Sequence, residues 1–194
     1  MTAPVGRVAP RPLPRARSSR ATEIIAAARE VLATEGPAAL TMRRLGEVLG
    51  IRAASLYKHL PSKGAVESAL LEQALAELGE RMHEAIDAAA SGASVEALLA
   101  VYRRQALAEP NLYRLATSGA LDRGALTPGL EEWAGEPFYR ATGEPYRAQA
   151  LWAAAHGAAI LEIDGRFLVG SDLDRMWQAL ARAFTPASPR DQAR

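Results

Sequence analysis

Cysteine is absent from the 194 residues, and histidine occurs only as His59, His83 and His156. A chain without cysteine has neither disulfides nor thiolate metal ligands. The three histidines lack the spacing of a zinc or iron site, so we expect no metal and no cofactor. A Gly-rich phosphate loop and the nucleophile turn of serine hydrolases are missing as well, and we predict that the protein is not an enzyme.

Long apolar runs are also missing, because none reaches the roughly 18 residues that a membrane-spanning helix needs. The N-terminus contains Arg and Pro but no apolar segment typical of a secretory signal. We therefore expect no membrane partner and a cytoplasmic location. Hydrophobic residues make up 49% of the chain, which is enough for a packed core.

The net charge of +1 conceals an uneven distribution. Residues 1–63 contain eleven Lys or Arg and four acidic residues, whereas the remainder contains twelve and eighteen. This asymmetry indicates that the N-terminal part meets a polyanion. The alternative is a chance distribution of surface charge.

The first 19 residues differ in composition from the rest of the chain. They contain four Pro and four Arg and almost no large apolar residues, which predicts a disordered basic arm. After Arg20 the apolar period is helical almost everywhere, β-branched residues are few and Ala is abundant. The sequence therefore predicts an all-α fold.

About nine helices are expected in total. The first ends at Gly36, the second follows Thr41 and ends at Gly50 with Leu45, Val48 and Leu49 inward, and the third ends before Pro61. The fourth is long, from Ser62 to about residue 90. The others are expected at about 94–109, 111–119, 129–142, 145–168 and 172–184.

Residues 40–66, LTMRRLGEVLGIRAASLYKHLPSKGAV, have the layout of a helix-turn-helix. A DNA reader presents the start of its second helix to the major groove. Small side chains let that helix lie deep, and an Ala methyl can contact a thymine methyl. The residues at this start are Arg52, Ala53, Ala54 and Ser55.

Three side chains with hydrogen-bond donors suited to phosphate oxygens follow this helix start: Tyr57, Lys58 and His59. Lys63 stands at the start of the long helix, where free backbone N–H groups favour an anion. Thr41 adds a hydroxyl at the start of the second helix. The alternative is that Tyr57 and His59 are half-buried packing residues within a solvated charged face.

This segment, with the preceding ATEIIAAAREVLATEG, resembles the DNA-binding module of TetR-family transcriptional regulators. The resemblance covers about the first third of the chain and is carried by LTMR (40–43), LG (49–50), SLYKH (55–59) and SK (62–63). It implies phosphate contacts from Thr41, Ser55, Tyr57, His59 and Lys63. It also implies base-edge readout by Arg43 and by residues 52–54.

Three positions depart from the family pattern. Arg52 stands where a capping Ser is common, and Leu60 replaces a commoner Phe. Gly46 replaces a commoner Ala inside the second helix, which suggests a closer approach to the first helix.

The C-terminal part contains LWAAAHGAAILEI at residues 151–163, which resembles the Trp-His-Gly element of one TetR subfamily. Trp152 and His156 lie one helical turn apart, either as core residues or as part of a ligand cavity. Aromatic residues are concentrated in this part, as expected for an apolar cavity between helices. The residues that we assign to this cavity are Met82, Tyr102, Tyr113, Trp133, Phe138, Trp152 and His156.

The last two helices are expected to form a four-helix bundle with a second copy, with Leu173 and Trp177 in the seam. A homodimer also suits a short recognition helix, which needs two half-sites of a palindromic double-stranded DNA operator. An enzymatic alternative would pair His156 with Glu162 or Asp164, but helical spacing puts neither carboxylate beside the imidazole.

The predicted organisation is an arm (1–19), a three-helix helix-turn-helix DNA-binding domain (20–65), a larger ligand-binding and dimerisation domain (66–186) and a flexible tail (187–194). The predicted function is that of a TetR-type transcriptional regulator, a repressor released from its operator by a small, largely apolar effector. The alternative is a DNA-binding regulator that responds to no ligand.

Overall fold

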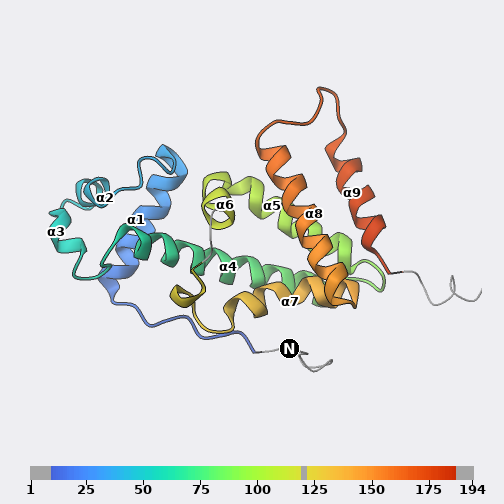
Figure 1. Cartoon of the computed structure of the whole chain (residues 1–194), viewed down its shortest axis with the longest axis horizontal. Coiled ribbons are helices and arrows are strands. Elements are labelled where there is room, and N and C mark those ends of the chain that lie inside the picture. The colour runs from blue at the N-terminus through green and yellow to red at the C-terminus, as the bar shows by residue number, and fades with distance from the viewer. Residues whose placement is uncertain (1–9, 119–121, 187–194) are drawn as a thin grey trace, which may run out of the picture.

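Nine α-helices and one short 3-10 helix make up the regular structure of residues 10–118 and 122–186, which are the residues that the computed structural model describes (Figure 1). No strand occurs among these residues, and the predicted all-α class is confirmed. The elements are α1 (Ser19–Glu35), α2 (Met42–Val48), α3 (Ala53–Leu56), α4 (Lys63–Ala88), α5 (Ser94–Ala108), α6 (Pro110–Thr117), η1 (Arg123–Ala125), α7 (Leu130–Thr142), α8 (Pro145–Ile163) and α9 (Leu173–Phe184).

Side-chain caps fix where the helices of the N-terminal part begin. The hydroxyls of Ser18, Thr41 and Ser62 accept hydrogen bonds from the third backbone N–H beyond them, at 3.2, 3.1 and 3.0 Å. Each bond satisfies a donor that the first turn of a helix leaves free. The starts of α1, α2 and α4 are therefore encoded locally.

Glycines end α2 and α8 in the same way. Gly50 and Gly165 have φ of 64° and 60°, a left-handed conformation that suits glycine. Ile51 N–H donates to the Gly46 carbonyl at 2.9 Å, and Arg166 N–H donates to the Leu161 carbonyl at 2.8 Å. This geometry stops α8 at Ile163, so the prediction of a helix to residue 168 was wrong.

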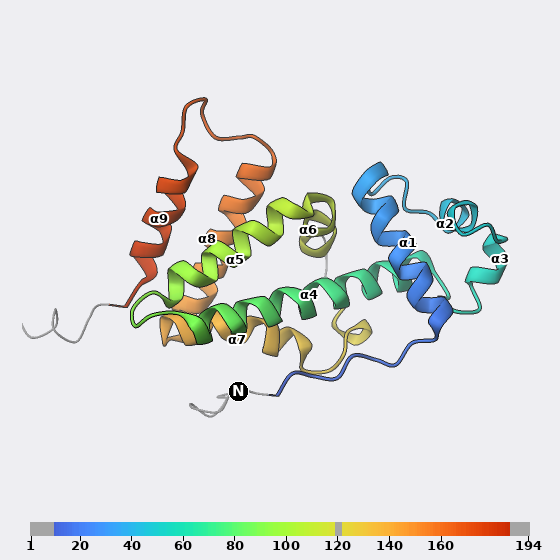
Figure 2. The same ribbon diagram turned by 180° about the vertical axis from the view of Figure 1, so that it is seen from behind.

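Two main hydrophobic cores lie at the two ends of the molecule. The first joins α1, α2 and α3 to the start of α4, and it also includes Leu112 of α6. The second lies among α4, α5, α7, α8 and α9. The first core takes Val66, Ala69 and Leu70 from α4, beyond the boundary expected at residue 65. The long helix α4 thus belongs to both cores and connects them (Figures 1 and 2).

Residues 10–18 form an extended segment that runs along α4 and η1 (Figure 1). Arg17 donates to the buried Glu72 carboxylate at 2.5 Å, and Arg15 donates to the carbonyls of Gly124 and Leu126 at 3.2 and 2.8 Å. Disorder was expected up to residue 19, but these contacts order the segment because a buried carboxylate needs a cationic partner. Residues 1–9 and the predicted tail at 187–194 lie outside the described part.

Two details of the N-terminal helices differ from the predictions. Val48 was expected inward but is largely exposed, whereas Leu49 packs against the first core. The third helix is shorter than expected, since α3 ends at Leu56, although Leu60 beyond it is buried. Within the described residues, no helix is both long and apolar enough to cross a membrane.

Candidate functional site

The predicted DNA-contacting residues belong to α2, α3, the turns beside them and the start of α4, and α2 and α3 lie at one end of the molecule (Figure 1). Leu56 is completely buried and anchors α3 to the first core, so the other side of this short helix faces outward. All ten predicted residues except Ala53 are exposed, and Ala53 is half-buried. The exposed members are Thr41, Arg43, Arg52, Ala54, Ser55, Tyr57, Lys58, His59 and Lys63.

The cations of this surface have few partners within the protein. The Arg43 side chain is 89% exposed and, among the described residues, meets only Glu47, at 3.6 Å. Arg52 and Lys58 make no ion pair or side-chain hydrogen bond with any described residue. Lys63 is closer to a carboxylate, with Nζ 3.3 Å from Glu67. The surface therefore carries positive charge that the rest of the described chain leaves available to an anion.

Tyr57 and His59 do not pack into the core, which disfavours the alternative of half-buried packing residues. Tyr57 is 49% exposed, and His59 is exposed with Nδ1 3.4 Å from the Ser18 hydroxyl. Both side chains can therefore reach a ligand outside the protein. Arg52 occupies the N-cap position of α3 without a side-chain cap, as its chemistry requires.

Gly46 sets the close approach between α2 and the beginning of α3. A Cβ at this position would lie 2.8 Å from the Ile51 carbonyl oxygen and 3.2 Å from the Ala53 nitrogen. The close contact is thus with the turn and α3, not with the first helix as predicted. The absence of a side chain at Gly46 therefore lets the turn between α2 and α3 pack closely against α2.

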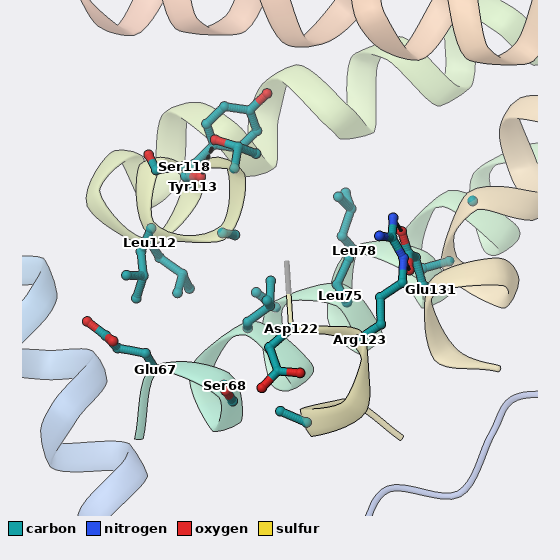
Figure 3. Close-up of a pocket in the computed structure, with 18 of the residues that line it drawn as sticks. Glu67, Ser68, Leu75, Leu78, Leu112, Tyr113, Ser118, Asp122, Arg123 and Glu131 are labelled. Carbon is teal, nitrogen blue, oxygen red and sulfur yellow. Dashed lines mark hydrogen bonds and ion pairs between the residues drawn. The ribbon is translucent and has the colours of Figure 1, made fainter. Parts of the chain in front are cut away.

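A cavity of about 1190 Å³ extends from the α3–α4 connection to α8. Its walls come from α4, α5, α6, α7 and α8, together with residues of the N-terminal segment and η1. Leu75 and Leu78 of α4 and Tyr113 of α6 enclose it in Figure 3. Leu75 and Leu78 are half-buried because one side of each faces this cavity.

Six of the seven residues predicted for a ligand cavity line this space: Met82, Tyr102, Tyr113, Phe138, Trp152 and His156. Trp133 does not. Its ring stacks on His83 at a centroid distance of 4.7 Å, and its carbonyl oxygen lies 3.0 Å from His83 Nε2. Trp133 is buried between α4 and α7 because Gly79 lets the two helices approach closely, with no room for a Cβ beside the indole.

A chain of hydrogen bonds joins three of the cavity residues. The hydroxyls of Tyr102 and Tyr113 are 2.9 Å apart, and the Tyr113 hydroxyl is 2.9 Å from His156 Nδ1. Burial raises the pKa of Tyr102 and of Tyr113, so both phenols are neutral at physiological pH. Trp152 stacks near His156, with ring planes 23° apart and centroids separated by 6.3 Å.

The suggested acid/base pairs of His156 do not form. Glu162 accepts hydrogen bonds from Arg103 and from the Trp177 indole N–H, the latter at 2.7 Å. Asp164 instead pairs with Arg114. Trp177 is buried inside its own chain, so its predicted place in a subunit seam was wrong.

Charged residues at the other end of the cavity were not predicted. Arg17 and Arg123 line it, and each is paired with a carboxylate. Arg17 pairs with Glu72, and Arg123 pairs with Glu131, as Figure 3 shows. Glu72 also accepts from the Thr127 amide at 2.8 Å and from its hydroxyl at 2.5 Å. Burial raises the pKa of Glu72, but the hydrogen bonds from Thr127 and Arg17 hold it below its ordinary value overall.

An arginine of α1 connects the DNA-facing end to the cavity walls. The Arg29 guanidinium binds both oxygens of Glu77 on α4, at 2.6 and 2.7 Å, and both oxygens of Glu109 before α6, at 2.8 and 2.6 Å. Asn111 also donates to the Leu32 carbonyl at 2.9 Å. Figure 2 shows α6 lying between α5 and α1. Helix α6 is therefore fixed to α1 on one side and lines the cavity on the other.

Two family models match the chain, and together they cover most of it. Residues 24–70 match the model described as bacterial regulatory proteins, tetR family. Residues 95–184 match a tetracyclin repressor-like C-terminal domain. The chain belongs to the TetR family. It is a TetR-family DNA-binding transcriptional regulator whose C-terminal part is a domain of the ligand-binding type.

Solved structures share the fold at low sequence identity. A protein with unknown function from Rhodococcus sp. RHA1 is 22% identical, with a TM-score of 0.72 and coverage of 89% of this chain and 99% of that one. The multidrug binding protein EbrR complexed with imidazole is 24% identical, with a TM-score of 0.64 and coverage of 90% and 99%.

A third TetR-fold structure is a TetR variant from Acinetobacter baumannii AYE in complex with minocycline. It is 23% identical to this chain, with a TM-score of 0.57 and coverage of 84% of this chain and 91% of that one. Among curated proteins, none matches the chain significantly. At these identities the three structures establish the fold alone.

Proposed function

We propose that this TetR-family protein is a cytoplasmic, non-catalytic repressor that leaves a palindromic operator when a small, largely apolar effector fills the cavity. The observation that carries the proposal is the place of α6. Leu112 belongs to the first core, whereas the next residue, Tyr113, is hydrogen-bonded to His156 in the cavity. An effector that displaces Tyr113 therefore acts next to a core residue of the DNA-binding part.

On the DNA side, we assign base-edge readout to Arg43 and to residues 52–54. The exposed hydroxyl and cationic groups of Thr41, Ser55, Tyr57, Lys58, His59 and Lys63 are assigned to phosphate contacts. The small side chains of Ala53 and Ala54 let the start of α3 enter the major groove. The short α3 reads few base pairs, which is why a second copy is needed for useful specificity.

We propose that two copies pair through the outward faces of α8 and α9. The outward side of α8 carries the small or apolar residues Ala150, Ala153 and Leu161, all exposed. The α8–α9 connection, which projects beyond the two helices in Figure 1, contains Leu168, and this side chain is 85% exposed. Exposed apolar groups of this kind are typical of a surface that a partner covers. This seam excludes Trp177, which already packs within one chain.

The dimer is tested by Leu161→Glu, which places charges near the proposed two-fold axis. We expect monomers with an unchanged helical circular dichroism signal and weakened operator binding, measured by light scattering and DNA titration. Trp177→Glu is the contrasting variant and is expected to unfold the C-terminal part, because it inserts a charge into a core. A stable Leu161→Glu dimer would refute this seam.

The release of the protein from its operator by an effector is tested with DNA that the protein selects from a random duplex pool. We expect the selected sites to be palindromic, and an effector found by thermal-shift screening to release the protein from them. An effector that stabilises the protein without changing DNA affinity would contradict the repressor mechanism. Operator binding without any stabilising compound would favour the ligand-independent regulator.

We also propose that the C-terminal part belongs to the Trp-His-Gly subfamily. The support is the pattern of Trp152, His156 and Gly157 on α8. Trp152 and His156 line the cavity and stack on each other, which gives this element a role in effector binding. Exchanging either residue should therefore change effector affinity, measured by calorimetry, more than it changes DNA affinity.

A further inference from the structure

The cavity is divided by chemistry into a charged end and an aromatic end. The arginines that line it belong to the N-terminal segment and η1. The lining residues of α5 and α8 include no Lys, Arg, Asp or Glu; they are Tyr102, Gln105, Ala148, Gln149, Trp152 and His156. A charged ligand group at this aromatic end would lose hydration without meeting an opposite charge, which is costly.

The carboxylate that lines the cavity at the α5–α6 junction is already paired. Glu109, at the α5–α6 junction, is bound by Arg29 at 2.6 Å. This arginine holds the pKa of the Glu109 carboxyl below its ordinary value, so the group remains ionised and engaged. Among the lining residues of α5, α8 and the α5–α6 junction, a charged ligand group would therefore find no unpaired counter-charge.

The hydrogen-bond chain leaves one imidazole nitrogen for the ligand. His156 Nδ1 is engaged by the Tyr113 hydroxyl, and among the described residues Nε2 has no hydrogen-bond partner. If Nδ1 carried the hydrogen, Tyr113 would donate to Tyr102, and the hydroxyl hydrogen of the buried Tyr102 would lack an acceptor. The chain is satisfied when Tyr102 donates to Tyr113 and Tyr113 donates to Nδ1. In that arrangement Nε2 carries a hydrogen and is a donor.

The rings of Tyr113, His156 and Trp152 follow one another in space, with a moderate tilt between successive ring planes. The Tyr113 and His156 planes differ by 31°, and the His156 and Trp152 planes differ by 23°. Trp152 lines the cavity and is 51% exposed, so a large part of its indole is free to contact a ligand. Flat aromatic molecules pack favourably on such a surface through offset stacking.

We propose that the aromatic end of the cavity binds an uncharged, flat aromatic effector that stacks on Trp152 and accepts a hydrogen bond from His156 Nε2 through an oxygen atom. This inference rests on the proposed function, since it specifies the effector of the same cavity. The Tyr102–Tyr113–His156 chain sets the direction of the hydrogen bond. The aliphatic side chains of α4 and α6 receive the rest of the molecule.

Four naphthalene derivatives test the proposal by calorimetry on the full-length protein: acetonaphthone, ethylnaphthalene, naphthoate and naphthylmethylammonium. They share one ring system and differ in the polar group. We expect acetonaphthone to bind roughly 5-fold more tightly than ethylnaphthalene, the gain typical of one hydrogen bond. Both ions should bind more weakly than acetonaphthone.

Variants separate the hydrogen bond from the stacking. His156→Phe keeps a ring but removes the donor, so the preference for acetonaphthone over ethylnaphthalene should disappear. Tyr113→Phe frees Nδ1 and should reduce the same preference if His156→Phe fails to fold. Trp152→Phe should weaken all uncharged probes, whereas Trp177→Phe, outside the cavity, should leave their affinities unchanged.

Tighter binding of either ion, a preference that survives His156→Phe, or no binding of any probe at its solubility limit would overturn the inference. Operator titration is measured on the same preparations. A protein that binds its operator and is released by a charged compound would keep the proposed function while this inference fails.

Discussion

The DNA-facing surface and the cavity differ in how their charged side chains are partnered. On the DNA-facing surface, Arg52 and Lys58 have no ion-pair partner in the described chain. In the cavity, Arg123 is held by Glu131 at 2.7 Å, and Glu72 by Arg17 at 2.5 Å. Unpaired cations at a surface attract a polyanion from water, whereas charges that are already paired gain less from a charged ligand.

Because of this difference, DNA binding and effector binding should respond differently to salt. Surface charges act over a Debye length of about 10 Å at 0.1 M salt, so DNA affinity should fall steeply as salt rises. Stacking and one hydrogen bond act at contact. Effector affinity should therefore change little over the same salt range.

The largest effect is expected from reversing a charge on the DNA-facing surface. Arg52→Glu removes a base or phosphate contact and adds repulsion, so operator affinity should fall at least about 100-fold. The fold should be unaffected because Arg52 is exposed. DNA titration and thermal melting measure the two quantities. Arg104→Glu, the same change at an exposed position of α5, is the control and should leave affinity nearly unchanged.

The next effect concerns the crossing of α4 and α7 behind the cavity. At Gly79 a Cβ would lie 2.6 Å from the Trp133 ring and 3.1 Å from the Ala134 Cα. Gly79→Ala should therefore reduce the free energy of unfolding by about 1–3 kcal/mol, as overpacked cores do. Gly135→Ala is the matched control, since its Cβ would meet nothing within 4 Å. Equal melting temperatures for the two variants would contradict the close packing.

Two lysines of the DNA-facing surface differ in whether a carboxylate pairs with them, and they are expected to differ in their contribution to DNA affinity. Lys58→Ala should weaken binding to all duplexes about equally and reduce the salt slope by about 1 per subunit. Lys63→Ala should cost less, because Lys63 gives up its pairing with Glu67 to reach a phosphate. Salt titrations of both variants measure this order. A changed base preference with an intact salt slope would exclude the phosphate roles.

The smallest effect is expected where the N-terminal segment meets Glu72. Arg17→Ala should reduce the free energy of unfolding by about 1 kcal/mol at neutral pH, between the values for exposed and buried ion pairs. Because the folded protein lowers the pKa of Glu72, the stabilisation is present above the unfolded pKa and is lost as pH falls through the folded value. Denaturant unfolding at stepwise lower pH should thus show the difference from the unchanged protein shrinking. A constant difference would assign the effect to packing.

The helices were largely predictable because their signals are local. Ser18, Thr41 and Ser62 cap the helices that follow them, and Gly50 ends α2 as expected. The end of α8 was also encoded locally, by Gly165, but the apolar residues beyond it concealed the signal. Apolar spacing alone extended the predicted helix too far.

The cavity residues were only partly predictable, because pairing between distant helices leaves no local signal. Nothing in the sequence around Trp133 indicates that its ring stacks on His83, which lies fifty positions earlier in the chain. Trp177 is directed inward by Glu162 and by the Arg103 guanidinium, 5.8 Å from its ring. Glu72 did carry a signal, since it stands on the buried side of α4, where a carboxylate requires a partner.

The adjacency of Leu112 and Tyr113 also predicts what DNA does to the effector. If displacing Tyr113 lowers operator affinity by some factor, thermodynamic reciprocity requires the operator to lower effector affinity by the same factor. The operator-bound protein would then be the less sensitive detector, and the unbound protein would capture effector first. The effector concentration at which a promoter responds would consequently depend on how many copies of the protein in the cell are not bound to DNA.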